Sequence, residues 1–225
     1  MLSSAVFYDA NIQHIMEKTI EAQKKERIIV YVDGFNLYFG MIEAGFDYCK
    51  WLNLKLLANN LINDKQEVIE VKYFTSRVSN NPDKQKRQSI YLEALVSVGV
   101  KIYYGHYQRD TITCKVCGSV WPNYNEKMTD VNIATQIILD AYKNEYDAAI
   151  LISGDSDLVP PIKAVHENFK NKRVIVAFPP KRFNNSVALV AKGSFIIGRK
   201  KLVDSQFDEE VTKRDGFKLK KPTDW

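Results

Sequence analysis

The chain has 225 residues, of which 45% are hydrophobic and 26% are charged, and its formal net charge at pH 7 is +5. This length and apolar content predict one well-filled α/β domain and argue against two domains. No apolar run approaches the ~20 residues that cross a bilayer, and the first residues lack the basic start of a signal peptide, so we expect a cytoplasmic protein without a membrane partner.

Residues 1–26 precede the first predicted strand and form an N-terminal helical extension. Ile12, Ile15, Met16 and Ile20 recur at helical spacing. This pattern predicts a short amphipathic helix that packs on the main domain or on a partner.

Apolar runs and amphipathic segments alternate from residue 27 to residue 198. Such alternation is typical of an α/β fold, in which helices cover both faces of a mainly parallel sheet. We therefore predict a single domain with a sheet of about five strands, followed by a charged, basic tail over residues 199–225. The predicted strands are 27–33, 67–75, 100–105, 148–153 and 173–178. The predicted helices are 36–62 with a break near Phe46–Cys49, 83–99, 130–146, 157–170 and about 184–192.

Three carboxylates lie where two of these strands end. Asp33 ends "RIIVYVD", and Asp155 and Asp157 follow the strand in "AAILISGDSD". In open parallel α/β sheets, ligands bind at the carboxyl ends of the strands. We therefore expect the three side chains to face the same edge of the sheet.

Asp130 is a fourth candidate, at the start of a predicted helix. The residues that share its helical stripe are apolar: Ile133, Ala134, Ile137, Ile138 and Ala141. A carboxylate on a stripe that faces the core is costly unless something compensates its charge. Thr129 is the expected N-cap, which places Asp130 in the first turn, where the helix dipole favours negative charge.

Each acid also has a purely structural interpretation. Asp33 before Gly34 suits a turn, Asp157 suits a helix N-cap, and Asp130 suits a dipole partner. Four carboxylates converging on one edge, however, repel one another unless a cation lies among them. Such oxygen clusters bind hard divalent ions, so we predict Mg²⁺ or Mn²⁺ held by Asp33, Asp130, Asp155 and Asp157.

Three segments of the chain resemble the motifs of NYN-domain proteins, a branch of the PIN-like nucleases. They are "VYVDGFNLYFG", "EKMTDVNIA" and "LISGDSDLVPPI", in the family's order, within a resemblance that spans roughly residues 27–198. The resemblance implies a PIN-like sheet and metal-dependent cleavage of RNA at an acidic cluster. The acidic positions of the family correspond to Asp33, Asp130, Asp155 and Asp157. Asn36 matches the asparagine of the first motif, which is implied to orient a carboxylate, a water or a phosphate.

The chemistry of the residues agrees with a metal-dependent hydrolase. Metal ions held by aspartates polarise a phosphate, activate water and stabilise the leaving oxygen, so no catalytic histidine is needed. His14, His106 and His166 all lie outside the three motifs. Two alternatives remain open: a non-catalytic RNA- or protein-binding module that keeps a Mg²⁺-binding acidic site, and another Mg²⁺-dependent phosphoryl-transfer enzyme. A glycine-rich phosphate loop is absent from the sequence, which argues against an ATPase.

Basic residues follow two of the predicted strands and are candidates for binding RNA, single-stranded or structured. Arg77 follows the second strand, and Lys181 and Arg182 follow the fifth, so all three emerge at the edge that carries the aspartates. They suit the phosphate backbone, with Asn184 and Asn185 as further donors, and Tyr38 and Phe183 suit stacking on unpaired bases. Solvated loop charges and packed aromatic rings explain the same residues.

Cys114 and Cys117 lie in "CKVCGSVW", within an insert over residues 106–127. Cys-x-x-Cys before a glycine is half of a typical tetrahedral zinc site, and only Cys49 and His106 could add further soft ligands. Structural Zn²⁺, a metal-free knuckle and a redox pair all remain open, although a redox pair usually starts a helix after a strand. A zinc ion shared between two chains would make the protein a homo-oligomer.

Overall fold

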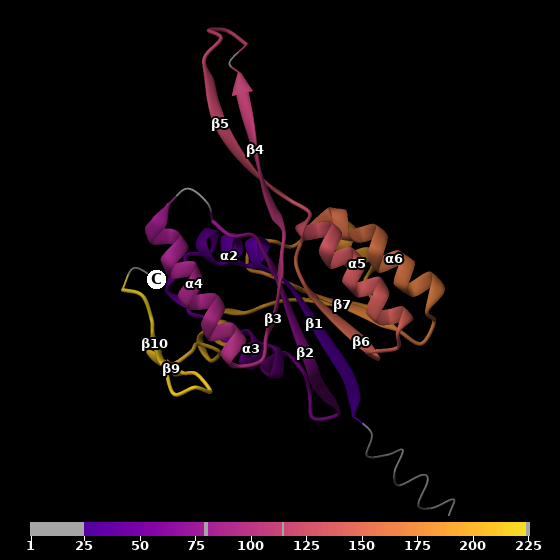
Figure 1. The fold of residues 1–225 in the computed structure, drawn as a ribbon. Helices are drawn as coiled ribbons and strands as arrows, with labels where there is room; N and C mark the ends of the chain where they lie inside the picture. The colour runs from indigo at the N-terminus through magenta and orange to yellow at the C-terminus, as the bar shows by residue number, and fades with distance from the viewer. Residues whose placement is uncertain (1–24, 79–80, 114, 224–225) are drawn as a thin grey trace, which may run out of the picture.

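The computed structural model describes residues 25–78, 81–113 and 115–223, so the helix predicted within residues 1–26 lies outside the described residues. In the described chain, six strands form one parallel sheet in the order β3-β2-β1-β6-β7-β8 (Figure 1). They are β1 (Glu26–Asp33), β2 (Gln66–Thr75), β3 (Lys101–Tyr104), β6 (Ala148–Ile152), β7 (Arg173–Phe178) and β8 (Gly193–Ile196). The predicted α/β class is confirmed, with one strand more than predicted. The added strand, β8, is a short edge strand with three exposed residues, so it lacks the apolar run of a buried strand.

Helices cover both faces of the sheet (Figure 1). One face carries α2 (Gly34–Glu43), α3 (Leu54–Leu61) and α4 (Pro82–Ser97), and the other carries α5 (Thr129–Tyr142), α6 (Val159–Asn168) and α7 (Asn185–Val190). Alternate residues of β1 enter the two cores, with Val30 on the α2 side and Tyr31 on the α5 side. Burial on both faces explains why β1 reads as a continuous apolar run. Two short 3₁₀ turns, η1 (Asp47–Cys49) and η2 (Ser156–Leu158), lie between these elements. Within the described residues, no helix is both long enough and apolar enough to cross a membrane.

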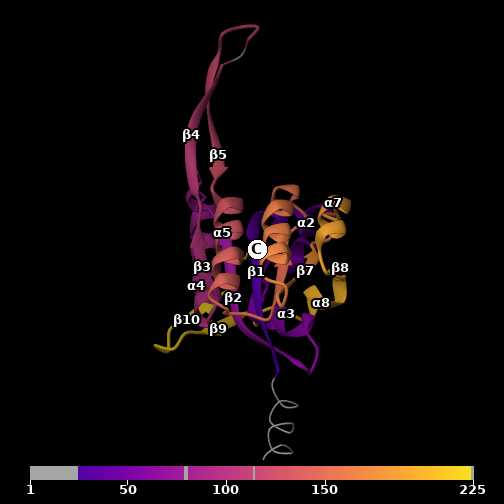
Figure 2. The same ribbon diagram turned by 90° about the vertical axis from the view of Figure 1, so that its right-hand side faces the viewer.

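The segment predicted as an irregular insert is a β-hairpin. Its strands, β4 (His106–Thr113) and β5 (Val120–Lys127), pair antiparallel from His106 opposite Lys127 to Thr113 opposite Val120. Figures 1 and 2 show the hairpin extending away from the rest of the domain. Because it does not lie against the main sheet, its sequence needs no apolar stripe, and the strand pattern is weak.

The segment predicted as a charged tail is folded onto the domain. It forms α8 (Arg199–Val203) and an antiparallel pair, β9 (Glu210–Thr212) and β10 (Lys218–Lys220). Leu202, Val211 and Leu219 are buried in the core on the α2 side of the sheet. These apolar residues are isolated among charged ones, which is why the composition alone indicates a tail.

A buried ion pair fixes α5 against the sheet. Lys72 on β2 is 4% exposed, and its Nζ lies 2.6 Å from Oδ2 of Asp140 on α5. The hydroxyl of Tyr31 on β1 donates to the same oxygen at 2.5 Å. Burial lowers the pKa of Lys72, but the hydrogen bond and the charge of Asp140 outweigh it and raise the pKa, so the lysine stays charged. This contact sets the position of the helix that carries Asp130 in its first turn.

The two central strands are also joined at their amino ends. Asp147, which precedes β6, accepts hydrogen bonds from the guanidinium Nη2 of Arg27 at 2.9 Å and from the Arg27 backbone N–H at 2.9 Å. These bonds outweigh partial burial and lower the pKa of the Asp147 carboxyl from its usual value near 3.8 to about 2. Asp147 therefore remains ionised in the folded protein at pH values where it would be protonated in the unfolded chain.

Asp140→Ala should destabilise the protein by up to about 3 kcal/mol, because the buried Lys72 ammonium loses its nearest carboxylate and keeps only Glu70 at 3.3 Å and the amide oxygen of Gln136 at 3.1 Å. The free energy of unfolding from urea titrations measures this loss. The double variant Lys72→Met/Asp140→Leu removes both charges and should recover most of it. Equal destabilisation of the single and double variants would show that packing, and not the buried charge, explains the loss.

Asp147→Asn should lower the urea midpoint at pH 7, where the wild-type carboxylate is fully ionised in both states. Because the folded pKa is depressed, the stabilisation is present above the unfolded pKa and is lost as the pH falls toward the folded pKa. The difference between the two proteins should therefore shrink as the pH falls from about 4 toward 2. A difference that stays constant over this range would contradict the assignment.

Candidate active site

Asp33, the last residue of β1, is buried at the carboxyl edge of the sheet, with only 5% of the residue exposed. Its Oδ1 accepts the backbone N–H of Asn36 at 3.0 Å and thereby caps α2, and its Oδ2 accepts the hydroxyl of Ser153 at 2.8 Å. A buried carboxylate is costly without such hydrogen bonds. Asp33 therefore holds together the end of β1, the start of α2 and the end of β6.

The loop after β6 is ordered by the same serine. The Ser153 hydroxyl donates to Asp33 and accepts the backbone N–H of Asp155 at 3.1 Å. Asp155 in turn caps η2, where its Oδ1 accepts the backbone N–H of Asp157 at 2.9 Å. One oxygen of Asp155 is thus fixed, and its side chain stays partly exposed beside Asp33.

Gly154 is held from two sides. Its backbone N–H donates to Oδ1 of Asn36 at 2.9 Å, and its carbonyl accepts Nδ2 of Asn184 at 3.0 Å. A Cβ on Gly154 would lie only 1.9 Å from the carbonyl oxygen of Arg182. The glycine therefore allows the loop after β7 to approach the loop after β6.

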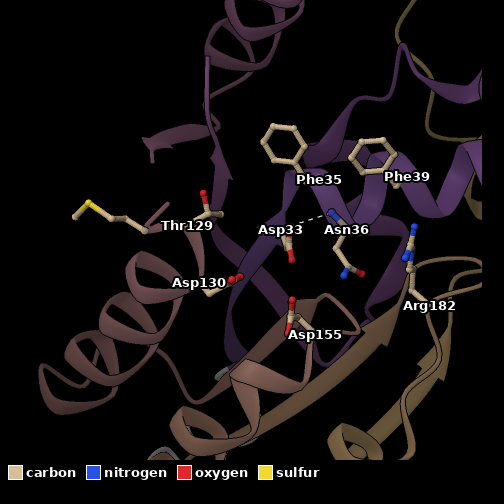
Figure 3. A pocket seen from close by; sticks show the side chains of 9 residues that line it. Asp33, Phe35, Asn36, Phe39, Thr129, Asp130, Asp155 and Arg182 are labelled. Atoms are coloured by element: carbon tan, nitrogen blue, oxygen red, sulfur yellow. Dashed lines mark hydrogen bonds between the residues drawn. The ribbon is translucent and has the colours of Figure 1, made fainter. Parts of the chain in front are cut away.

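These elements enclose a cleft of about 220 Å³ at the carboxyl edge. Figure 3 shows the carboxylates of Asp33, Asp130 and Asp155 pointing into one shared space from β1, α5 and the loop after β6. The cleft is lined by Asp33, Phe35, Asn36, Phe39, Met128, Thr129, Asp130, Asp155 and Arg182.

Arg182 contributes a positive charge to the acidic cleft. Its guanidinium pairs with the carboxylate of Glu43 at the end of α2. The Nε atom of Arg182 is buried and has no hydrogen-bond partner in the described part of the chain. Because Nε is buried, what Arg182 brings to the wall of the cleft is its positive charge.

The other predicted polar residues lie outside the cleft. Asp157 is exposed in η2, and Lys181 is exposed with a φ of +60°. The Arg77 guanidinium stacks 5.0 Å from the ring centre of Tyr104, in a separate groove that Lys213 also lines. All three basic candidates follow the carboxyl end of β2 or β7, as predicted, but only Arg182 lines the acidic cleft.

The Cys-x-x-Cys motif falls, in sequence, between the hairpin strands β4 and β5. Cys114 is outside the described residues, whereas Cys117 is exposed and its Sγ lies 3.2 Å from the Ser119 hydroxyl. Cys49 is buried in the core on the α2 side of the sheet and is no candidate ligand for an ion at this turn. Zinc binding at Cys114 and Cys117 stays a prediction.

Several residues of the site were not predicted. Ser153 is fully buried and supports Asp33 from behind the cleft lining; it directly follows the apolar run of β6, and a polar residue at the end of a buried strand is a signal that could have been used. Phe35 and Phe39 are four residues apart on α2, a spacing that places them on one helical face. Thr129 was predicted as the N-cap of α5, but that position is occupied by Met128 with a φ of +80°, and Thr129 is the first, buried residue of the helix.

The donor set fits a divalent cation that keeps part of its water. Carboxylate and amide oxygens are the ligands that Mg²⁺ and Mn²⁺ prefer, and Mg²⁺ usually retains several waters. Among the described residues, no three His, Cys, Asp or Glu side chains are grouped closely enough to hold a metal ion as they stand. Asp33, Asp130 and Asp155 therefore suit a divalent ion by their chemistry, whereas direct coordination by all three would require their side chains to move closer together.

A parallel α/β sheet with a carboxylate-lined cleft at its carboxyl edge is consistent with a PIN-like domain. The NYN domain model matches residues 27–197, and the chain belongs to the NYN domain family, a PIN-like nuclease family. The chain is 24% identical over 195 residues to the 6-hydroxy-3-succinoylpyridine 3-monooxygenase HspA of Pseudomonas putida, a match that covers 71% of this chain and 62% of that protein. It therefore spans less than two thirds of this relative. A crystal structure of a Vibrio parahaemolyticus protein of unknown function has 25% identity and a TM-score of 0.58, over 82% of this chain and 98% of that one.

Gly154→Ala should destabilise the protein by about 1–3 kcal/mol, because the new methyl group cannot fit beside the Arg182 carbonyl. Thermal melting and urea titration measure the effect. Gly193→Ala is the matched control, since a Cβ there meets no atom within 4 Å. A Gly154→Ala variant as stable as the control would mean that the two loops do not approach as closely as the structure shows.

Proposed function

We propose that this protein is a metal-dependent ribonuclease that hydrolyses RNA phosphodiester bonds at the acidic cleft. The observation that carries the proposal is the convergence of Asp33, Asp130 and Asp155, from three separate elements, on one cleft beside Arg182. Membership of the NYN family supports it, because the family belongs to the PIN-like nucleases.

In this proposal, Asp33, Asp130 and Asp155 hold Mg²⁺ or Mn²⁺, and Asn36 supports them by fixing Gly154. A bound divalent ion supplies Lewis-acid chemistry, polarising the phosphate and making water more acidic. Arg182, whose guanidinium pairs with Glu43, contributes positive charge at the wall of the cleft, which favours the binding of a phosphate. Asp157 lies outside the cleft lining, so we assign it a smaller contribution than the other three acids.

The alternative of a non-catalytic module uses the same cleft to bind RNA or a protein without cleaving it. The P. putida relative is named as a monooxygenase that acts on a substituted pyridine, an activity that differs from both RNA cleavage and RNA binding. That activity belongs to a longer protein, of which the match covers 62%. We favour RNA hydrolysis because the donor set of the cleft is that of a hard divalent cation, and its cationic neighbour suits a phosphate.

Purified protein should cleave labelled single-stranded or hairpin RNA with Mn²⁺ or Mg²⁺ and should be inactive in EDTA. Asp33→Asn and Asp155→Asn should each lower the cleavage rate by at least about 100-fold, because each removes a ligand charge from the metal. Asp157→Asn should lose less, and the exposed Asp64→Asn should behave as wild type. Gel electrophoresis of the products measures the rate, and thermal melts verify that each variant is folded.

Cleavage that persists in EDTA, or in a folded Asp33→Asn variant, would overturn the proposal. RNA that binds but is not cleaved under any metal condition would favour the non-catalytic module.

A further inference from the structure

A second groove, of about 430 Å³, lies between α2 and α4. Phe35 and Phe39 line both this groove and the acidic cleft, so the two are continuous across α2. Figure 3 shows both rings at the cleft, projecting from the α2 segment beside Asp33 and Asn36. A polymer bound at the aspartates can therefore continue into the groove.

The groove has an aromatic surface. Tyr38 and Phe39 are 40% and 47% exposed, and their rings meet edge to face at 5.3 Å. Phe35 stacks on Phe39 at 6.2 Å, and Tyr73 lies deeper in the groove. Exposed aromatic side chains that adjoin one another form the kind of surface on which nucleic acid bases stack.

Cationic side chains accompany these rings. Lys50, Lys84 and Arg87 line the groove, and no Asp or Glu does. Neither Lys50 nor Lys84 forms an ion pair with a carboxylate of the described chain. Lys50 and Lys84 therefore offer positive charge that no carboxylate of the described chain pairs with, next to a cleft whose charge is mainly negative.

We propose that the α2–α4 groove binds an unpaired nucleotide of the RNA next to the one held at the acidic cleft. The base stacks on the ring of Tyr38, with the perpendicular ring of Phe39 beside it, and the phosphate is bound by Lys84 and Arg87. This inference rests on the proposed ribonuclease function and adds the substrate class: single-stranded RNA. Bases inside an A-form duplex are already stacked and are not available to such a groove.

Equilibrium binding tests the groove separately from cleavage. The Asp33→Asn chain is titrated in EDTA against a fluorescein-labelled 12-nucleotide single-stranded RNA, against the same length of abasic ribose phosphate, and against a blunt duplex, with anisotropy as the readout. Adding Tyr38→Ala should weaken binding of the single strand about tenfold. It should leave the abasic strand unchanged, and Tyr38→Phe should restore binding. Tyr142→Ala, which removes an exposed tyrosine from the far end of α5, is the matched control.

Lys84→Ala should weaken both the single-stranded RNA and the abasic strand and should lower the salt dependence of binding by about one unit. Equal affinity for duplex and single strand, with no effect of Tyr38→Ala, would overturn the base-binding groove. So would a complete lack of RNA binding. If the wild type cleaves RNA but Tyr38→Ala leaves the affinity for the single strand unchanged, this inference alone is overturned. If Tyr38→Ala weakens binding of the single strand but the wild type cleaves no RNA, only the nuclease proposal is overturned.

Discussion

The hydrogen bond between Ser153 and Asp33 is the contact on which the candidate site depends. It connects the carboxyl ends of the two central strands, β1 and β6, and it satisfies a carboxylate that is almost fully buried. Without it, Asp33 would lose one of the hydrogen bonds that compensate its burial, and the loop that carries Asp155 would lose one of its anchors. The pair Arg27–Asp147 connects the same two strands at the opposite edge. The two central strands are therefore joined at both their amino and their carboxyl ends. The cleft lies at the carboxyl ends, beside the Ser153–Asp33 connection.

Helix α2 serves two surfaces at once. Its first turn is capped by Asp33 and supplies Asn36 to the loop after β6, while Tyr38 and Phe39 lie exposed on the side of the α2–α4 groove. Its last turn places Glu43 against Arg182. A small rotation of this helix would change the acidic cleft and the aromatic groove together. The buried residues Leu37 and Met41, which pack into the core, oppose such a rotation.

The sequence predicts the sheet well because burial on both faces makes its central strands strongly apolar. It predicts the placement of Asp33 and Asp155 for the same reason, since each follows a strand whose end is clear. Asp130 was predicted from the apolar helical stripe that it continues, but the buried Lys72–Asp140 pair that fixes its helix against the sheet is revealed by no local pattern. The hairpin and the folded C-terminal segment were not foreseen, because β4 and β5 lack an apolar stripe and Val211 and Leu219 are single apolar residues among charges. Lys181 and Arg182 are neighbours in sequence, yet only Arg182 reaches the cleft. Which of them does so is set by the left-handed backbone at Lys181.

The order of the strands has a consequence for how the chain is made. Asp33 and Ser153 are 120 residues apart, and β6 pairs directly with β1. At a synthesis rate of ~5–20 residues per second, roughly 6–24 s pass between the emergence of the two partners from a ribosome. During that interval β1 can pair with β2, but its other edge stays open and apolar. Until β6 is synthesised, the nascent chain therefore exposes an unpaired strand edge that can pair with another chain. We expect this interval to be the one in which a chaperone does most to prevent aggregation.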